Sequence, residues 1–239
     1  MSDSTPATAF LDSCRIDDSV HELRPDYRAQ LLVIEGLDAA ASSSLADGLI
    51  ARAEAHARNL LAETPVDQLP HIAAWREAYR AFGAKPQRTR NSLEALTRRA
   101  EGGLPRVNAL TDVYNAISVL HQIPLGGEDL DRYQGGVHLV RAAGDEPFDT
   151  LARGEDVVEH PEAGEVVWRD DAGVTCRRWN WRQGRRTALT DGTSTALFIM
   201  DALAPVDDAA LAAAGDELAA ALATLGEGVT VTRRVLTAG

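Results

Sequence analysis

The chain has 239 residues, of which 45% are hydrophobic and 25% are charged, as in an ordinary soluble globular protein. The net charge of −12, from 36 acidic and 24 basic residues, argues against a protein that binds nucleic acid over its whole surface. No apolar run reaches the roughly 20 residues of a membrane span, and the start MSDSTPATAF does not resemble a secretory signal. We therefore expect a cytoplasmic protein without a membrane partner.

The first elements expected are one buried strand and two helices. LLVIEGL at residues 31–37 is a short apolar run that predicts a buried strand. The three serines at 42–44 are suited to capping a helix over 45–62. A second helix is expected over 68–82, because its large apolar residues recur at helical spacing.

A basic loop and a third helix follow. The loop KPQRTRNS presents Lys85, Arg88 and Arg90 together. Ser92 begins the next helix, and the glycine pair at 102–103 ends it.

Residues 104–131, LPRVNALTDVYNAISVLHQIPLGGEDLD, combine a helix with a polar face and a Gly-Gly turn. One helical stripe is apolar. A second stripe is polar and consists of Asp112, Asn115 and Ser118. One face can therefore pack while the other offers polar groups to a cleft.

The second half of the chain is expected to be rich in strands. Strands are expected over 136–142, 195–203 and 228–236, a helix over 208–225, and a hairpin over 165–181. Alternation along the second hairpin strand would place Cys176, Arg178 and Asn180 on one face, and Trp179 and Trp181 on the other.

These elements predict an α+β fold: a single domain with mixed or antiparallel sheets and flanking helices. Residues 1–65 are expected to form an N-terminal strand and helix portion packed on the main domain, which covers 66–239.

Basic residues are concentrated in two segments. Residues 76–106 hold eight basic and three acidic residues, and residues 177–186 hold five basic residues and no acid. The rest of the chain carries 11 basic and 33 acidic residues. The two segments either steer a phosphate chain to one face or pair with the acidic surplus.

Familiar catalytic and cofactor motifs are missing from the sequence. It has no G-x-S-x-G elbow, no P-loop and no G-x-G-x-x-G after a strand. The six histidines and two cysteines lack metal-ligand spacing, so neither a metal nor a cofactor is expected. Cys176 lies in an arginine-rich strand, where nearby positive charge would lower the pKa of a thiol; the alternative is a small buried strand residue.

The segment PRVNALTDVYNAISVLHQIPLGGEDLD resembles the editing module of the bacterial phenylalanyl-tRNA synthetase beta subunit, formed by that subunit's third and fourth domains. The family pattern is P-I-N-x-V-V-D-V-T-N-Y, then G-Q-P-x-H-A-F-D, and the matching positions are Pro105, Asn108, Asp112, Asn115, Pro124 and Asp129. GGVHLVRAAGDEPFDTL and TDGTSTALFIM resemble later motifs of the module. The resemblance covers about residues 70–203, and it is closer still to freestanding versions that lack the aminoacylation apparatus.

The resemblance implies a pocket that hydrolyses the ester of a wrongly attached amino acid on tRNA. An aminoacyl ester is already activated, so the site needs only to orient water and stabilise developing negative charge. Asn115 falls at the family's pocket asparagine and is the expected catalytic residue; the alternative is that it braces the helix against a loop. The substrate is expected to contact Asn108, Asp112, Tyr114, Gly126 and Gly127.

The sequence also departs from the family pattern. Tyr114 replaces a threonine, and Gly126 replaces the pocket histidine, so no imidazole is expected there. The family's Gly-Gly-Glu loop, which reads a tyrosine hydroxyl, has no clear counterpart, and tyrosine specificity is therefore not carried over. Arg178, Asn180 and Trp181 are expected instead to set another specificity or to grip the terminal adenosine. For the tryptophans, the alternative is core packing.

Three functions are compatible with these residues. The first is a freestanding aminoacyl-tRNA editing hydrolase, a trans-editing deacylase that supports translation fidelity, with Lys85, Arg88 and Arg90 contacting tRNA. The second is a non-catalytic module that binds tRNA or an amino acid, which the missing histidine favours. The third is an enzyme that uses the same pocket for another aminoacyl or small-molecule substrate.

Overall fold

The computed structural model describes residues 5–40, 44–152 and 154–238. Its helices are α1 (Pro6–Ser13), α2 (Asp18–Leu23), α3 (Ser44–Glu63), α4 (Pro70–Ala81), α5 (Ser92–Arg99), α6 (Ala109–His121) and α7 (Asp208–Leu222), with short 3-10 turns η1 (Val66–Gln68) and η2 (Leu130–Arg132). Its strands are β1 (Arg15–Ile16), β2 (Arg28–Glu35), β3 (Leu125–Asp129), β4 (His138–Arg141), β5 (Phe148–Ala152), β6 (Glu155–Glu159), β7 (Val166–Asp170), β8 (Gly173–Arg177), β9 (Arg182–Gln183), β10 (Thr195–Ala202) and β11 (Thr230–Leu236). None of the described helices has the length and apolarity needed to cross a membrane.

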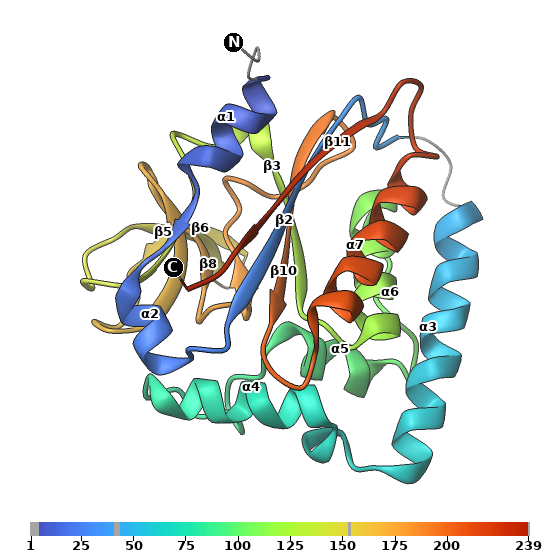
Figure 1. Cartoon of the computed structure of the whole chain (residues 1–239), viewed down its shortest axis with the longest axis horizontal. Helices are drawn as coiled ribbons and strands as arrows, with labels where there is room; N and C mark the ends of the chain where they lie inside the picture. Colours follow the sequence, from blue (N-terminus) through green and yellow to red (C-terminus); the bar gives the residue numbers. More distant parts are fainter. Residues whose placement is uncertain (1–4, 41–43, 153, 239) are drawn as a thin grey trace.

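A four-stranded antiparallel sheet in the order β11-β2-β10-β3 forms the centre of the molecule (Figure 1). β2 and β10 are buried on both faces, which explains why each is a nearly continuous apolar run. Leu32 and Phe198 point toward the helices, whereas Leu31 and Leu197 point toward the other side. The sheet therefore separates two hydrophobic cores.

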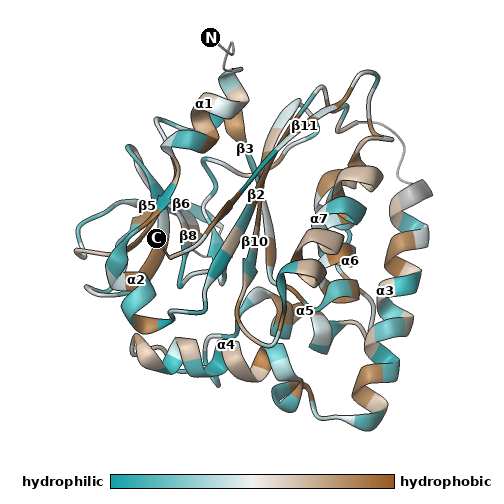
Figure 2. Ribbon diagram, in the orientation of Figure 1, coloured by the Kyte–Doolittle hydropathy of each residue, from teal (hydrophilic) through white to brown (hydrophobic). Residues whose placement is uncertain are grey.

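Helices α3, α6 and α7 cover one face of this sheet (Figure 1). α3 and α7 carry both apolar and polar residues around their turns (Figure 2), whereas α6 is buried on nearly all sides. A five-stranded mixed sheet, β1-β4-β7-β8-β9, packs on the other face. Trp179 lies in this second core, 5.2 Å from Trp75 and 4.9 Å from Tyr27 between ring centroids, both in edge-to-face geometry.

The predicted α+β class, with mixed and antiparallel sheets and flanking helices in a single domain, is confirmed. The strand expected at 31–37 overlaps β2, and the helices expected from 45, 68, 92 and 208 correspond to α3, α4, α5 and α7. Serines 42 and 43 of the expected cap lie outside the described residues. β2 pairs with β10 and β11, so residues before 66 contribute to the central sheet; the division at residue 65 stays a prediction.

Two local predictions are wrong. Gly126 and Gly127 do not form a turn but lie within β3, where they pair with Ile199 and Phe198 of β10. The strand expected to continue to 181 ends at Arg177, because Arg178 and Trp179 adopt left-handed backbone angles, with φ of 48° and 69°. Alternation is lost there, so Arg178 and Asn180 do not continue the face of Cys176.

Trp179→Ala is expected to lower the free energy of unfolding by about 3–5 kcal/mol, because the indole is fully buried among aromatic rings and its removal leaves a cavity. Urea denaturation measures the change. Leu151→Ala, at a side chain that is 45% exposed, serves as the control and should shift stability by less than about 0.5 kcal/mol. Equal effects of the two substitutions would contradict the assignment of Trp179 to the core.

Candidate functional site

A cavity of about 260 Å³ lies between the two sheets, beside α5 and α6. Residues of α5 and α6 form one wall of the cavity, and residues of β3 and β10 form a second wall. The remaining wall consists of residues from β7, β8 and the segment 179–183. Of the expected site residues, the cavity is lined by Tyr114, Asn115, Gly126, Asn180 and Trp181. The structure thus brings together residues from two segments that are far apart in the sequence.

Only one residue of the polar stripe on α6 reaches the cavity. Asp112 accepts a hydrogen bond from the backbone N–H of Val107 at 2.8 Å, and Ser118 donates to the carbonyl oxygen of Ile123 at 2.6 Å. Asn115 is only 8% exposed and lines the cavity. Asn115 is therefore the residue of this polar stripe that faces the cavity.

Asn108 has a structural position at the start of α6. Its side-chain oxygen accepts the N–H of Thr111 at 2.9 Å, the usual role of an N-cap residue. Neither Asn108 nor Asp112 lines the cavity, and both fix the beginning of the helix that carries Asn115.

Gln183 fills the space beside Gly126. A Cβ atom on Gly126 would lie 2.8 Å from Gln183 Nε2. Gln183 donates to the carbonyl oxygen of Gly127 at 3.0 Å and accepts from the Tyr114 hydroxyl at 3.4 Å. Gly126 occupies the position at which the synthetase editing module has a histidine. Without a side chain there, the Gln183 side chain of β9 packs directly on the backbone of Gly126. Gly127 points the other way, toward Phe198.

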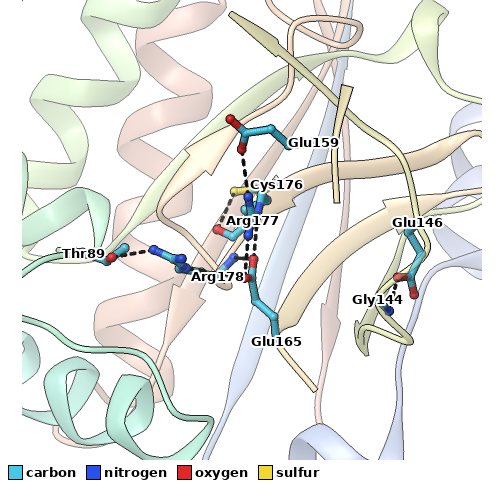
Figure 3. A network of polar contacts seen from close by, with 8 residues as sticks. All are labelled: Thr89, Gly144, Glu146, Glu159, Glu165, Cys176, Arg177 and Arg178. Carbon is cyan, nitrogen blue, oxygen red and sulfur yellow. Dashed lines mark hydrogen bonds and ion pairs between the residues drawn. The ribbon is translucent and has the colours of Figure 1, made fainter. Parts of the chain in front are cut away.

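A buried ion pair holds the turn after β8 (Figure 3). The Arg177 guanidinium donates to both oxygens of Glu165 at 2.8 Å and to Glu159 at 3.0 Å. The backbone N–H of Arg178 also donates to Glu165, at 3.2 Å. This bidentate, charge-assisted geometry stabilises the left-handed turn that sends Asn180 and Trp181 to the cavity.

The same turn contacts the basic loop before α5. Arg178 donates to the hydroxyl of Thr89 (Figure 3). The backbone N–H of Ser92 donates to the carbonyl oxygen of Asn180 at 2.9 Å. The Arg178 guanidinium also lies over the ring of Trp181, 4.5 Å from its centroid, a cation–π contact. The two basic segments of the sequence therefore meet beside the cavity.

Several arginines of these segments pair with acids, as one of the two readings of the charge pattern predicts. Arg76 and Arg98 bind the fully buried Glu94, Arg186 binds Asp170, and Arg185 binds Asp156. Arg90 lies 3.7 Å from Glu94.

Five other basic residues of the two segments have no carboxylate partner in the described ranges. Arg80 is exposed near the end of α4, and Lys85 and Arg88 are exposed on the basic loop. Arg99 and Arg182 line the cavity. Of the five, Arg99 and Arg182 are thus the ones at the cavity itself.

Two buried carboxylates line the cavity, and neither was expected from the sequence. Asp201 of β10 accepts from the Tyr27 hydroxyl at 2.5 Å and from the Asn180 amide at 3.3 Å. Glu128 of β3 accepts from the Tyr133 hydroxyl and, at 3.5 Å, from the Gln183 amide. A signal for each was present: Glu128 follows the two glycines, and Asp201 is an isolated acid in an apolar strand.

Burial shifts the ionisation of this site. Removal from water raises the pKa of Asp201 to about 7, against the opposing hydrogen bonds from Tyr27 and Asn180. Burial also raises the pKa of Glu128, which the Tyr133 hydroxyl opposes.

Cys176 is not an activated nucleophile. Burial, and then the nearby carboxyls of Glu128 and Asp201, raise the pKa of its thiol well above the usual range. Of the two alternatives for Cys176, the structure agrees with the small buried strand residue, and the neighbouring Arg177 guanidinium binds Glu165. No group of three or more His, Cys, Asp or Glu side chains among the described residues is arranged to hold a metal.

Two sheets packed on each other, with a cavity beside α6, form an α+β domain. The model of the B3/4 domain family matches residues 74–227, and the chain belongs to this family. Among solved structures, an N-terminal fragment of the phenylalanyl-tRNA synthetase beta-subunit from Pyrococcus horikoshii is similar over 92% of this chain, with 12% sequence identity and a TM-score of 0.47; the chain spans 50% of that fragment. No curated protein matches. The resemblance to the synthetase beta subunit is thus confirmed at the level of the B3/4 domain.

Asp201→Asn is expected to change how stability depends on pH. Asp201 has a pKa of about 7 in the folded protein and about 3.8 in the unfolded chain, so the folded state binds its proton more tightly. The contribution of the protonated Asp201 carboxyl to the free energy of unfolding is fully present below pH 4. It is lost as the pH rises to about 7, and the total loss is roughly 4 kcal/mol.

Melting temperatures of the protein and the Asp201→Asn variant, measured from pH 4 to pH 8, test the predicted direction of this change in stability. The variant should gain stability relative to the parent protein as the pH rises through this window and show no further gain above it. A constant difference between the two proteins across the whole range would rule out titration of Asp201.

Proposed function

We propose that this protein is a freestanding aminoacyl-tRNA deacylase that hydrolyses mischarged tRNA in trans. The observation that carries the proposal is Asn115, a polar residue of α6 that lines the cavity of a B3/4 domain. An amide at the wall of such a cavity is suited to a hydrogen bond with a ligand.

The proposed chemistry is attack of water on the ester carbonyl. The amide Nδ2 of Asn115 donates a hydrogen bond to the carbonyl oxygen, where negative charge develops in the transition state. The ester bond breaks, the amino acid leaves as the free acid, and the terminal ribose hydroxyl of the tRNA is restored. Because an aminoacyl ester is activated, orienting the water and the carbonyl supplies much of the acceleration.

The proposed delivery of tRNA uses the basic edge of the cavity. Lys85 and Arg88 are exposed on the loop that Arg178 contacts through Thr89, and they attract the phosphate chain. Trp181, which is half-buried at the cavity and stacked under Arg178, offers a ring to the terminal base.

The direct experiment is a deacylation panel. Purified protein is incubated with tRNAs that carry non-cognate amino acids, and the remaining ester is measured over time. Asn115→Ala should slow the susceptible tRNA by about tenfold to a hundredfold, since losing a hydrogen bond to a charged group costs ~1.5–3 kcal/mol. Asn59→Ala, at an exposed position of α3, is the matched control and should keep full activity.

An alternative is a module that binds tRNA or an amino acid without chemistry. Two observations favour it: Gly126 provides no imidazole, and the Cys176 thiol is not activated. Binding of a mischarged tRNA that then decays no faster than in buffer, across the whole panel, would select this alternative over the deacylase.

Either function predicts salt-dependent tRNA binding. Lys85→Ala and Arg88→Ala should each weaken affinity and reduce the slope of log K against log salt by about 1, because each removes one phosphate contact. Filter-binding measurements of tRNA affinity at salt concentrations from about 50 to about 300 mM give these slopes. Arg233→Ala is the control, since it lies on β11 at the opposite edge of the central sheet from β3. Equal slopes for all three variants would exclude the loop from the contact surface.

A further inference from the structure

Trp168 carries an N–H group that is buried in the cavity wall without a hydrogen-bond partner. The side chain of this β7 residue is 1% exposed and lines the cavity, and its Nε1 atom has no partner among the described residues. Buried polar groups are hydrogen-bonded as a rule, so an exception calls for a physical explanation. An indole N–H can only donate, and the group missing at this position is therefore an acceptor.

The Trp168 N–H is directed toward the part of the cavity that Asp201 lines. Burial raises the pKa of Asp201, and Tyr27, Asn180 and the Trp168 indole each oppose that rise. Tyr27 and Asn180 act through hydrogen bonds of 2.5 Å and 3.3 Å, whereas the indole does not reach hydrogen-bond geometry. Asp201 therefore has two donors already, and the N–H of Trp168 lies near it with its hydrogen bond still to be made.

Two other buried indoles differ from Trp168. Trp75 donates to Nε2 of His71 at 3.1 Å. The N–H of Trp179 also lacks a partner in the described ranges, but it lies close to the Tyr27 hydroxyl, and the packing of these rings at 4.9 Å fixes its orientation in the core. Core packing among aromatic rings accounts for Trp179, and it does not account for the free N–H of Trp168.

A second donor on the cavity wall lacks a partner as well. Ser92 begins α5 and lines the cavity, and its hydroxyl oxygen is buried without a hydrogen-bond partner in the described part of the chain. Its backbone N–H donates to the carbonyl oxygen of Asn180, whose amide donates in turn to Asp201. The wall around Asn180 and Asp201 thus offers two donors for which the protein supplies no acceptor.

An uncharged carbonyl oxygen is the acceptor that best matches this position. A carboxylate or phosphate oxygen at Trp168 would approach the Asp201 carboxyl, whose hydrogen-bond donors are neutral side chains and not cations. A hydroxyl group would bring a proton that needs an acceptor of its own. A carbonyl oxygen has two lone pairs and no proton to place.

We propose that Trp168 Nε1 donates a hydrogen bond to an uncharged carbonyl oxygen of the ligand that occupies this cavity, with the Ser92 hydroxyl as a second donor to the same ligand. This assignment rests on the proposed function, because it takes the cavity as the place where the aminoacyl group binds. The carbonyl belongs either to the aminoacyl ester or to a carboxamide at the end of the amino acid side chain. Both sources share the same chemistry.

The indole N–H signals in the nuclear magnetic resonance spectrum of nitrogen-15-labelled protein report on this contact directly. The chain has four tryptophans, so the signals are few, and the Trp168→Phe variant identifies the signal of Trp168 by its loss. A hydrogen bond to a carbonyl oxygen moves such a signal downfield. This readout also detects ligands that bind weakly.

Three small probes of similar length separate the two sources of the carbonyl. Glutaminamide carries an α-carbonyl and a side-chain carboxamide, norleucinamide carries only the α-carbonyl, and norleucinol has a hydroxyl in its place. Glutaminamide should move the Trp168 signal downfield, and norleucinol should leave it in place. An equal shift with norleucinamide assigns the carbonyl to the aminoacyl ester, and a shift with glutaminamide alone assigns it to a side-chain carboxamide.

Trp168→Phe removes the N–H and keeps an aromatic ring. It should lower the affinity for glutaminamide by about fivefold or more, and it should leave the affinity for norleucinol unchanged. A purely structural role of Trp168 would change both affinities alike.

Ser92→Ala and Thr97→Val form a matched pair. Each removes from α5 a buried hydroxyl that has no partner among the described residues, but only Ser92 lines the cavity. Ser92→Ala should lower the affinity for glutaminamide by about threefold or more, and Thr97→Val should leave it unchanged. Thermal melting shows whether each variant is folded, and the probe comparison on the parent protein stands even if one is not.

The assignment is overturned if no probe moves the Trp168 signal, or if norleucinol moves it as far as the carbonyl probes do. Hydrolysis in the tRNA panel would leave the deacylase function standing in either case. Conversely, a shift that depends on the carbonyl, together with a panel of tRNAs that are not hydrolysed, would retain the Trp168 contact and reject the deacylase.

Discussion

The buried ion pair between Arg177 and Glu165 is the interaction on which the site depends. It fixes the end of β8 at the point where Arg178 and Trp179 turn into left-handed backbone. That turn sends Trp179 into the core between the sheets and leaves Trp181 at the cavity. Breaking a buried pair leaves one uncompensated charge in the interior, which makes this turn a rigid element of the fold. A flexible loop could not hold Asn180 against both Tyr79 and Asp201.

The cavity owes its chemistry to polar groups that the surrounding sheets do not neutralise. β3 and β10 contribute Glu128 and Asp201 from the inner face of the central sheet, and α6 contributes Asn115. Burial of the two carboxyls raises the pKa of each. Positive charge lies at the same site but on other elements, at Arg99 of α5 and Arg182 of β9.

The structure shows which arginines of the two arginine-rich segments pair with acids, and the steering of a phosphate chain stays a prediction. Glu94 and Glu165 each bind arginines from these segments inside the protein, so much of the apparent basic charge is structural. Lys85 and Arg88 remain exposed on the loop that touches the turn after β8. A count of charges along the chain could not distinguish these cases, because pairing depends on contacts between residues many positions apart, such as Arg178 and Thr89.

Local patterns in the sequence determined the elements. The apolar runs of β2 and β10 and the helical spacing of α4 and α6 were sufficient to predict them, because burial on both faces or on one stripe leaves a direct mark on residue order. Motif order also pointed to Asn115, which lines the cavity together with Tyr114, and its catalytic role stays a prediction. Tertiary structure alone decided the rest: that Gly126 faces Gln183, that the strand after Cys176 breaks at Arg177, and that Glu128 and Asp201 share one cavity. These features depend on packing between two sheets, and no short-range pattern encodes which side chains will meet across that interface.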